Sequence, residues 1–175
     1  MDIANCSPYI RFAGNIQLSK LCLRSVAYDH RLFYFTGGDG YILINGVSYP
    51  CSENSLVLFQ AGCVYQLSPG NTITAISINF DFTQAHHDMV DPLPTTTPEL
   101  ADQKQLLEKI SFSDYPILSH ELYLHDFPDI RNDLCQIVDE IRWRKPLFQE
   151  YSSSLLKKSI CKILRSFALN ISTKG

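Results

Sequence analysis

The sequence predicts a mainly β domain with C-terminal helices (an α+β arrangement), in which a sandwich or barrel of short strands precedes two α-helices. Two observations carry this prediction. Residues 21–82 contain short runs of β-branched and aromatic residues between frequent turn formers. Residues 128–170 show apolar residues at helical spacing. The 175 residues are enough to bury one core without disulfide or metal cross-links.

The first predicted elements are strands, each bounded by turn-forming residues. Asn45-Gly46 lies between two apolar runs and predicts a tight hairpin, because a type I′ turn needs two residues with positive φ. The expected strands are 21–27, 31–36, 41–45, 55–60 and 72–82.

The last of these strands alternates between two kinds of side chain. One side is strongly apolar and carries Thr74, Ile76, Ile78, Phe80 and Phe82. The other side is mostly small and polar and carries Ile73, Ala75, Ser77, Asn79 and Asp81. Because successive side chains point to opposite faces of a sheet, the polar side faces either solvent or a small-molecule cavity.

Residues 83–127 carry weaker patterns. The Pro- and Thr-rich stretch 91–98 is expected to be a loop. A short helix is expected over 99–110, started by Pro98, and an extra strand over 120–125.

Two helices are expected after this point, so the chain divides into a barrel (1–127) and a helical segment (128–175). Pro128 opens the first helix, and Ser152 to Ser154 are candidate N-caps of the second, 152–170. The second helix has a heptad-like apolar stripe, formed by Leu156, Ile160, Ile163 and Phe167. This stripe either forms an isologous homodimer interface or packs on the chain's own barrel.

Charge is divided unevenly along the chain. Residues 1–141 have a balance of −10 and residues 142–175 a balance of +7, which together give −3. The acidic body argues against nucleic-acid binding along the whole surface. The basic tail either faces a phosphate backbone or is a solvated helix face.

Cysteine spacing and hydropathy indicate a reducing compartment. No two of the six cysteines form a C-x-x-C pair, and the N-terminus lacks a basic start with an apolar stretch. No apolar run reaches 18 residues, so no membrane span is expected. The expectation is a cytoplasmic protein with reduced thiols.

The segments Arg31–Gly40, Tyr41–Gly46, Tyr49 and Ser55–Tyr65 together resemble a cupin barrel, and more narrowly the sensor half of AraC-type transcriptional regulators. That family shows a strand ending in Gly-x-Gly, a hairpin glycine, an aromatic residue, an apolar strand and a turn similar to Pro-x-Gly-x-x-His. The last element here is Gln60-Ala-Gly-Cys-Val-Tyr65.

Both ends of the chain extend the resemblance. Pro8–Gly14 is similar to the family's N-terminal arm, and Leu155–Lys158 with Ile163–Arg165 is similar to the helix before its DNA-binding half. The resemblance implies a cupin-like β-barrel of the jelly-roll type that senses a small effector, sugars being a frequent class, and that dimerises through the C-terminal helix. Contact with DNA would come only through a helix-turn-helix half that this sequence lacks.

Metal-dependent catalysis is the alternative function. The cupin enzymes hold a metal with two His and a Glu near the first glycine motif and a later His. Here His30 stands alone in the first region, Tyr65 takes the later His position, and His86 and His87 are adjacent. We therefore expect no metal, no cofactor and no catalytic residue. A cupin-type isomerase or dioxygenase with atypical ligands stays open as the alternative, as does a stand-alone carbohydrate-binding module.

Six residues are candidates for contacting the effector. Arg24 is charged within an apolar strand, so it either faces the pocket or extends outward. Tyr65 offers a hydroxyl or is barrel core. The small polar strand face adds Ser77 and Asn79. The predicted arm adds Tyr9 and Arg11, which either fold over the barrel mouth or are disordered.

Overall fold

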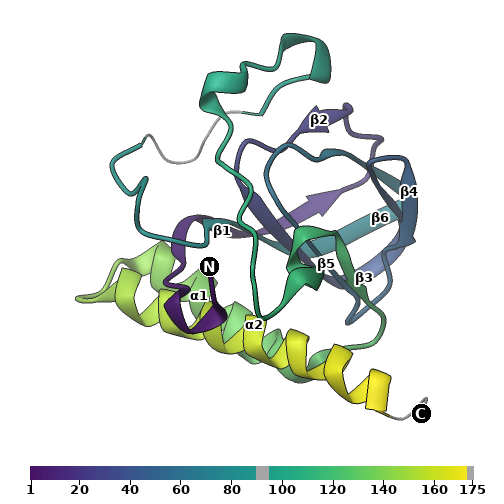
Figure 1. Ribbon diagram of the computed structural model, residues 1–175. Helices are drawn as coiled ribbons and strands as arrows, with labels where there is room; N and C mark the ends of the chain where they lie inside the picture. Colours follow the sequence, from purple (N-terminus) through teal and green to yellow (C-terminus); the bar gives the residue numbers. More distant parts are fainter. Residues whose placement is uncertain (90–94, 173–175) are drawn as a thin grey trace.

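The computed structural model shows one curled antiparallel sheet with two helices across its outer face (Figure 1). It describes residues 1–89 and 95–172, with side chains to residue 168; residues 91–94 of the expected loop lie outside this part. The sheet order is β1-β6-β3-β5-β7, with β2 paired to β6 and β4 paired to β3. The strands are β1 (Tyr9–Leu18), β2 (Ser25–Val26), β3 (His30–Ile44), β4 (Val47–Pro50), β5 (Leu56–Phe59), β6 (Val64–Asp81) and β7 (Leu122–Leu124).

Two long helices follow the sheet, and short 3-10 turns occupy the connections. The helices are α1 (Arg131–Trp143) and α2 (Phe148–Ser172). The 3-10 turns are Ile3–Asn5, Pro98–Leu100, Gln103–Gln105, Pro116–Ser119 and Pro128–Ile130. The prediction of a mainly β domain followed by two C-terminal helices is confirmed.

Glycines in β3 let the sheet curl. The pairing of β3 with β6 changes register at Phe35/Gly37 and again at Gly38/Gly40. Gly38 has φ 96°, and a Cβ there would lie 1.9 Å from the carbonyl oxygen of Thr72. Since only glycine accepts both constraints, this point is a fixed bend in the strand. The two halves of β3 then face one interior.

The curled sheet separates two apolar cores. The inner core contains residues from both halves of β3, Phe33 and Phe35 with Ile42 and Ile44. The outer core lies between the sheet and the helices and contains Ile76, Ile78 and Phe80 of β6. The apolar side of 72–82 therefore lies under the helices. Its small polar side faces the interior of the curled sheet, which is the cavity alternative rather than the solvent one.

The predicted dimer stripe lies inside the chain's own outer core. Leu156, Ile160 and Ile163 are each 0% exposed, and Phe167 is partly buried against the same cluster. The outer face of the sheet is apolar and has to be covered, and α2 supplies that cover. The structure thus favours the packing alternative for these four residues, and a dimer of this chain would need another surface.

Four local predictions are wrong, the first being the separate strands at 31–36 and 41–45, which form the single strand β3. Residues 99–110 form two 3-10 turns rather than a helix, because the Leu107 amide donates to the Tyr28 carbonyl and the Ile110 amide donates to Gln60. Ser152–Ser154 are not N-caps, because α2 already begins at Phe148. The segment 21–27 pairs only at Ser25–Val26.

The predicted N-terminal arm is also wrong, since Tyr9–Leu18 forms strand β1. This strand pairs with β6 along its length, from Tyr9 opposite Asp81 to Leu18 opposite Ile73. By contrast, the Asn45-Gly46 hairpin is confirmed, with φ of 49° and 88° at its two residues. The extra strand predicted in 120–125 is also present, as β7.

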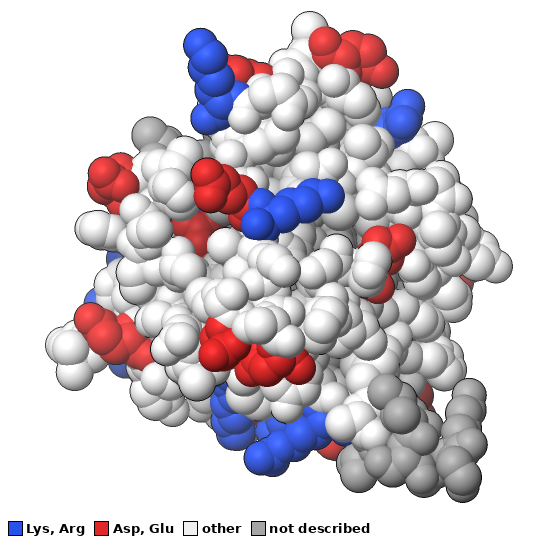
Figure 2. All heavy atoms as spheres, viewed as in Figure 1, with Lys and Arg blue, Asp and Glu red and all other residues white. Residues whose placement is uncertain are grey.

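Surface charge is mixed on the face of the molecule seen in Figure 2, where acidic and basic side chains are interspersed among uncharged ones. Lys158 and Lys162 of the basic tail bind Asp133 of α1 at 2.8 and 2.9 Å. Part of the tail's positive charge is therefore balanced within the chain. No described helix is long and apolar enough to cross a membrane. All six cysteines are free thiols.

The core role of α2 predicts a large stability loss for Leu156→Ala. We expect the free energy of unfolding to fall by about 2–5 kcal/mol, because the buried side chain leaves a cavity. Urea denaturation measures this, with the exposed Arg165→Ala as control. A change in oligomer mass with unchanged unfolding would instead support a dimer stripe.

The bend predicts that Gly38→Ala destabilises the fold by at least about 1 kcal/mol, since the new Cβ meets the Thr72 carbonyl. Gly46→Ala is the matched control: its φ is 88°, but nothing lies within 4 Å of its Cβ position. Thermal unfolding should show a larger loss for Gly38→Ala. Equal losses would show that backbone conformation alone, and not the close approach, fixes glycine at the bend.

Candidate ligand-binding site

A cavity of about 490 Å³ lies inside the curled sheet. Its volume is in the range of small-molecule pockets, and its wall combines apolar residues with polar ones. The apolar lining residues are Phe12, Ile16, Cys22, Leu23, Phe33 and Leu67. The polar ones are Ser25, Arg31, Tyr65, Ser77, Asn79 and Thr95.

Strand register brings the polar groups together. Asn79 of β6 is opposite Phe12 of β1 on one side and Arg31 of β3 on the other. Residues in register on neighbouring strands point to the same face, so these three side chains form one row across the interior. Ser77 and Phe33 belong to the next row, two residues along.

Arg31 is the central polar group of the cavity wall, and its side chain is only 5% exposed. Its Nε donates to Asp29 Oδ1 at 2.9 Å, and its Nη1 donates to the Tyr65 hydroxyl at 2.5 Å. The guanidinium also lies 5.2 Å from the centre of the Tyr65 ring. Asp29 is fully buried behind Arg31, so the interior carries a compensated pair of charges rather than a bare cation.

Two atoms of this pair lack a hydrogen-bond partner among the described residues, namely Arg31 Nη2 and Asp29 Oδ2. Buried polar atoms are normally paired, and an unpaired one costs free energy. The polar end of the interior therefore has unused hydrogen-bonding capacity.

Tyr65 is protonated at neutral pH. Burial raises the pKa of its hydroxyl above the usual value, while the charge of Arg31 acts in the opposite direction. The hydroxyl oxygen accepts from Arg31, and its own hydrogen has no acceptor among the described residues. Tyr65 is therefore a hydrogen-bond donor available to the cavity.

Ser77 and Asn79 are joined to each other. The Ser77 hydroxyl donates to Asn79 Oδ1 at 3.5 Å, and both residues are buried. The Asn79 amide nitrogen makes no hydrogen bond within the described part of the chain. Three predicted contact residues, Tyr65, Ser77 and Asn79, thus line one cavity together.

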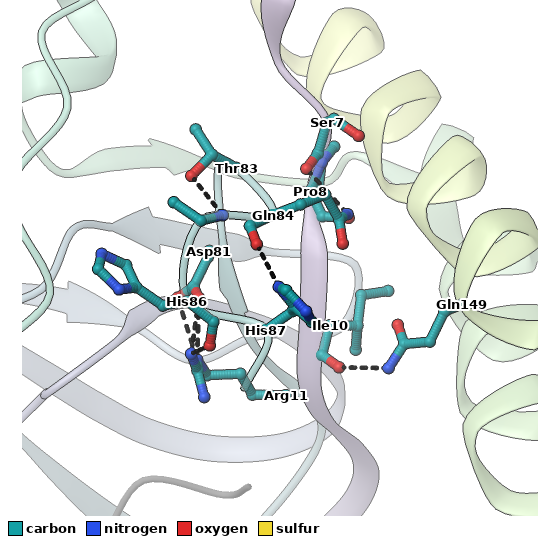
Figure 3. Close-up of polar contacts among 11 residues, drawn as sticks. Ser7, Pro8, Ile10, Arg11, Asp81, Thr83, Gln84, His86, His87 and Gln149 are labelled. Atoms are coloured by element: carbon teal, nitrogen blue, oxygen red, sulfur yellow. Dashed lines mark hydrogen bonds and ion pairs between the residues drawn. The ribbon is translucent and has the colours of Figure 1, made fainter. Parts of the chain in front are cut away.

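Arg11 lies elsewhere, in a second buried ion pair (Figure 3). It occupies the bulge of β1 between Ile10 and Phe12, where its Nε and Nη2 bond both carboxylate oxygens of Asp81 at 2.8–3.1 Å. Its Nη2 also donates to the His86 carbonyl. Arg11 therefore ties β1 to β6 and to the turn after β6, and it does not line the cavity.

Tyr9 and Arg24 are also outside the cavity. The Tyr9 ring faces His87, with centroids 6.5 Å apart. Arg24 is exposed and borders a separate hollow beside the Asn45-Gly46 hairpin. Of the two alternatives predicted for Arg24, facing the pocket or extending outward, the structure shows the second.

Sequence reasoning missed Arg31. The argument that selected Arg24, a charge within an apolar strand, applies equally to Arg31 in the run Arg31–Thr36. Its partner Asp29 lies only two residues earlier, in the bend before β3, and this close opposite charge is a further signal.

His30 has a structural position. It packs on the rings of Phe80 and Phe82, and its Nδ1 accepts the Ala61 amide at 3.1 Å. Burial, with a smaller effect from Arg11, lowers its pKa to about 3. Among the described residues, no group of three or more His, Cys, Asp or Glu is placed to hold a metal ion.

Three solved structures show distant likenesses to this chain. A Clostridium difficile EutQ protein aligns with 17% identity over 39% of this chain and 55% of its own, with a TM-score of 0.36. A cupin superfamily protein from Desulfitobacterium hafniense aligns with 7% identity over 39% of this chain and 65% of its own (TM-score 0.37). A salicylate 1,2-dioxygenase from Pseudoaminobacter salicylatoxidans aligns with 9% identity over 38% of this chain and 18% of its own (TM-score 0.35).

The aligned region thus spans less than two thirds of each of these proteins, and likenesses of this size carry no argument about function. No protein-family model matches the chain. No curated protein matches it either.

The buried His30 predicts acid sensitivity. The folded state keeps His30 neutral, whereas the unfolded chain takes up its proton below about pH 6.5. The unfolded state then binds more protons, so stability falls as pH decreases from 6.5 toward 3, by up to about 1.4 kcal/mol per pH unit.

His30→Asn removes this proton uptake and should flatten the dependence of unfolding free energy on pH over that window. Its amide oxygen can accept the Ala61 hydrogen in place of Nδ1. His120→Asn, which removes an exposed histidine, should keep the wild-type slope. Identical slopes for wild type and His30→Asn would contradict the account.

Proposed function

We propose that this chain is the ligand-sensing domain of an AraC-type transcriptional regulator and binds a small effector, without a metal, inside its curled sheet. One observation carries the proposal: the buried side chains of Arg31, Ser77 and Asn79 and the partly buried Tyr65 meet on the wall of a cavity of about 490 Å³. A ligand with matching polar atoms would satisfy the groups that the fold leaves unpaired. The regulator assignment rests on the order of motifs between Arg31 and Arg165.

Strand β1 contacts both the cavity and the helices, so a change in the cavity could be transmitted through it to α2. Its residue Phe12 lines the cavity, while the adjacent Ile10 and Ala13 belong to the outer core that the helices cover. Gln149 of α2 also donates to the Ile10 carbonyl at 3.1 Å. An effector that shifts β1 would change how α2 sits, and a population shift of this kind is what a sensor domain needs.

In this proposal, the domain itself reads no DNA. The helices would transmit the effector state to a helix-turn-helix half, which makes the DNA contact. Sugars remain one effector class to be tested.

A thermal-shift screen of small molecules, beginning with mono- and disaccharides and run with and without a chelator, tests the proposal. We expect a ligand-specific rise in melting temperature that survives the chelator, because a ligand of the folded state stabilises it. Ser77→Phe fills the cavity and should abolish the rise. Ser48→Phe, an exposed change on β4, should keep it.

Two outcomes would contradict this proposal. Ligands that stabilise Ser77→Phe as well as wild type would bind outside the cavity. A melting temperature that falls on chelation, with no ligand effect, would favour the metal-dependent enzyme instead.

A further inference from the structure

The hydrogen-bonding groups on the cavity wall are mainly donors. Arg31 has no acceptor atom at all. The Tyr65 oxygen already accepts one hydrogen bond from Arg31 while its O–H is free, and Asn79 Oδ1 already accepts one from Ser77 while its amide hydrogens are free. The strongest polar groups facing the cavity therefore require an acceptor from the ligand.

Charge on the wall has one sign. Arg31 is the only charged side chain among the described lining residues, and its partner Asp29 lies behind it, fully buried. A sugar presents many hydroxyls that need acceptors as well as donors. The described lining offers no carboxylate to accept them; its side-chain acceptors are the Asn79 amide oxygen and the hydroxyls of Ser25, Tyr65, Ser77 and Thr95.

Apolar residues flank the polar groups, and the apolar lining extends to the surface. Phe12 and Phe33 lie beside the polar row, and Ile16 and Leu67 continue the apolar wall. Leu23 lines the same cavity and is 77% exposed. The apolar lining therefore continues to the rim of the cavity.

We propose that the cavity binds a small amphipathic carboxylate, with the carboxylate at Arg31, Tyr65 and Asn79 and the apolar body along Phe12 and Phe33. This inference rests on the proposed function and narrows its effector class. Hydrogen bonds to a charged acceptor are stronger than those to a neutral one, so the head group determines which apolar molecules bind.

Calorimetric titration of the folded chain with three probes tests this inference. The probes are octanoate, octan-1-ol, which has the same chain without the carboxylate, and D-xylose. We expect octanoate to bind about tenfold or more tightly than octan-1-ol, because hydrogen bonds to a charged group contribute more binding free energy than hydrogen bonds to a neutral one. We expect D-xylose not to bind. This comparison needs no variant.

Tyr65→Phe locates the head group. The variant should lose most of the preference for octanoate over octan-1-ol, and the matched control Tyr41→Phe, an exposed tyrosine outside the cavity, should retain it. A preference that survives in Tyr65→Phe would overturn the inference, because the carboxylate would then lie elsewhere.

Other outcomes separate this inference from the proposed function. Equal binding of octanoate and octan-1-ol, or binding of D-xylose that depends on Tyr65, would reject the carboxylate and keep the cavity as a ligand site. Binding of none of the three would also reject the carboxylate class. The proposed function would then be tested with other ligands: it is supported if a ligand stabilises the wild type but not Ser77→Phe, and rejected if every stabilising ligand acts equally on both.

Discussion

Strand β6 is the constraint on which the rest of the structure depends, because its two faces must satisfy different surroundings. It pairs with β1, β2 and β3, so most of the sheet is built around it. One face, with Ile76, Ile78 and Phe80, has to be covered, and the helices cover it. The other face begins apolar at Ile73 and Ala75 and becomes polar from Ser77 onward. A shift of one residue in register would exchange these faces.

Because the inner face of β6 becomes polar at Ser77 and Asn79, the interior there contains a cavity with hydrogen-bonding groups instead of a purely apolar core. Arg31 lines this interior and is paired with Asp29, whereas Arg11 lies outside it and is paired with Asp81 at the end of β6. Buried pairs of this kind are weak evidence for stability, because desolvation offsets much of the attraction. Their effect here is on position: Arg11 holds β1 to the turn after β6 (Figure 3), and Arg31 fixes the Tyr65 hydroxyl.

Patterns within single elements predicted much of this arrangement. The alternation in 72–82 predicted both faces of β6, and the Asn45-Gly46 pair predicted its hairpin, since each depends on local geometry. Local patterns failed where long-range contacts decide. Residues 99–110 have helical character, yet Gln60 and the Tyr28 carbonyl hold them in another conformation. The stripe on α2 predicted an apolar contact but not its partner, because an apolar face is the same for a sheet and for a second helix.

In the candidate site, too, local patterns predicted some residues and long-range contacts decided the others. Ser77, Asn79 and Tyr65 were found because alternation and motif position place them, whereas Arg24 and Arg31 looked alike in sequence and only the pairing with Asp29 tells them apart. The most direct test of the central claim is a crystal structure of the chain grown with octanoate. The account predicts density inside the curled sheet, with the carboxylate within hydrogen-bond distance of the Tyr65 hydroxyl. Density confined to the hollow beside Arg24, or an empty interior at saturating octanoate, would contradict it.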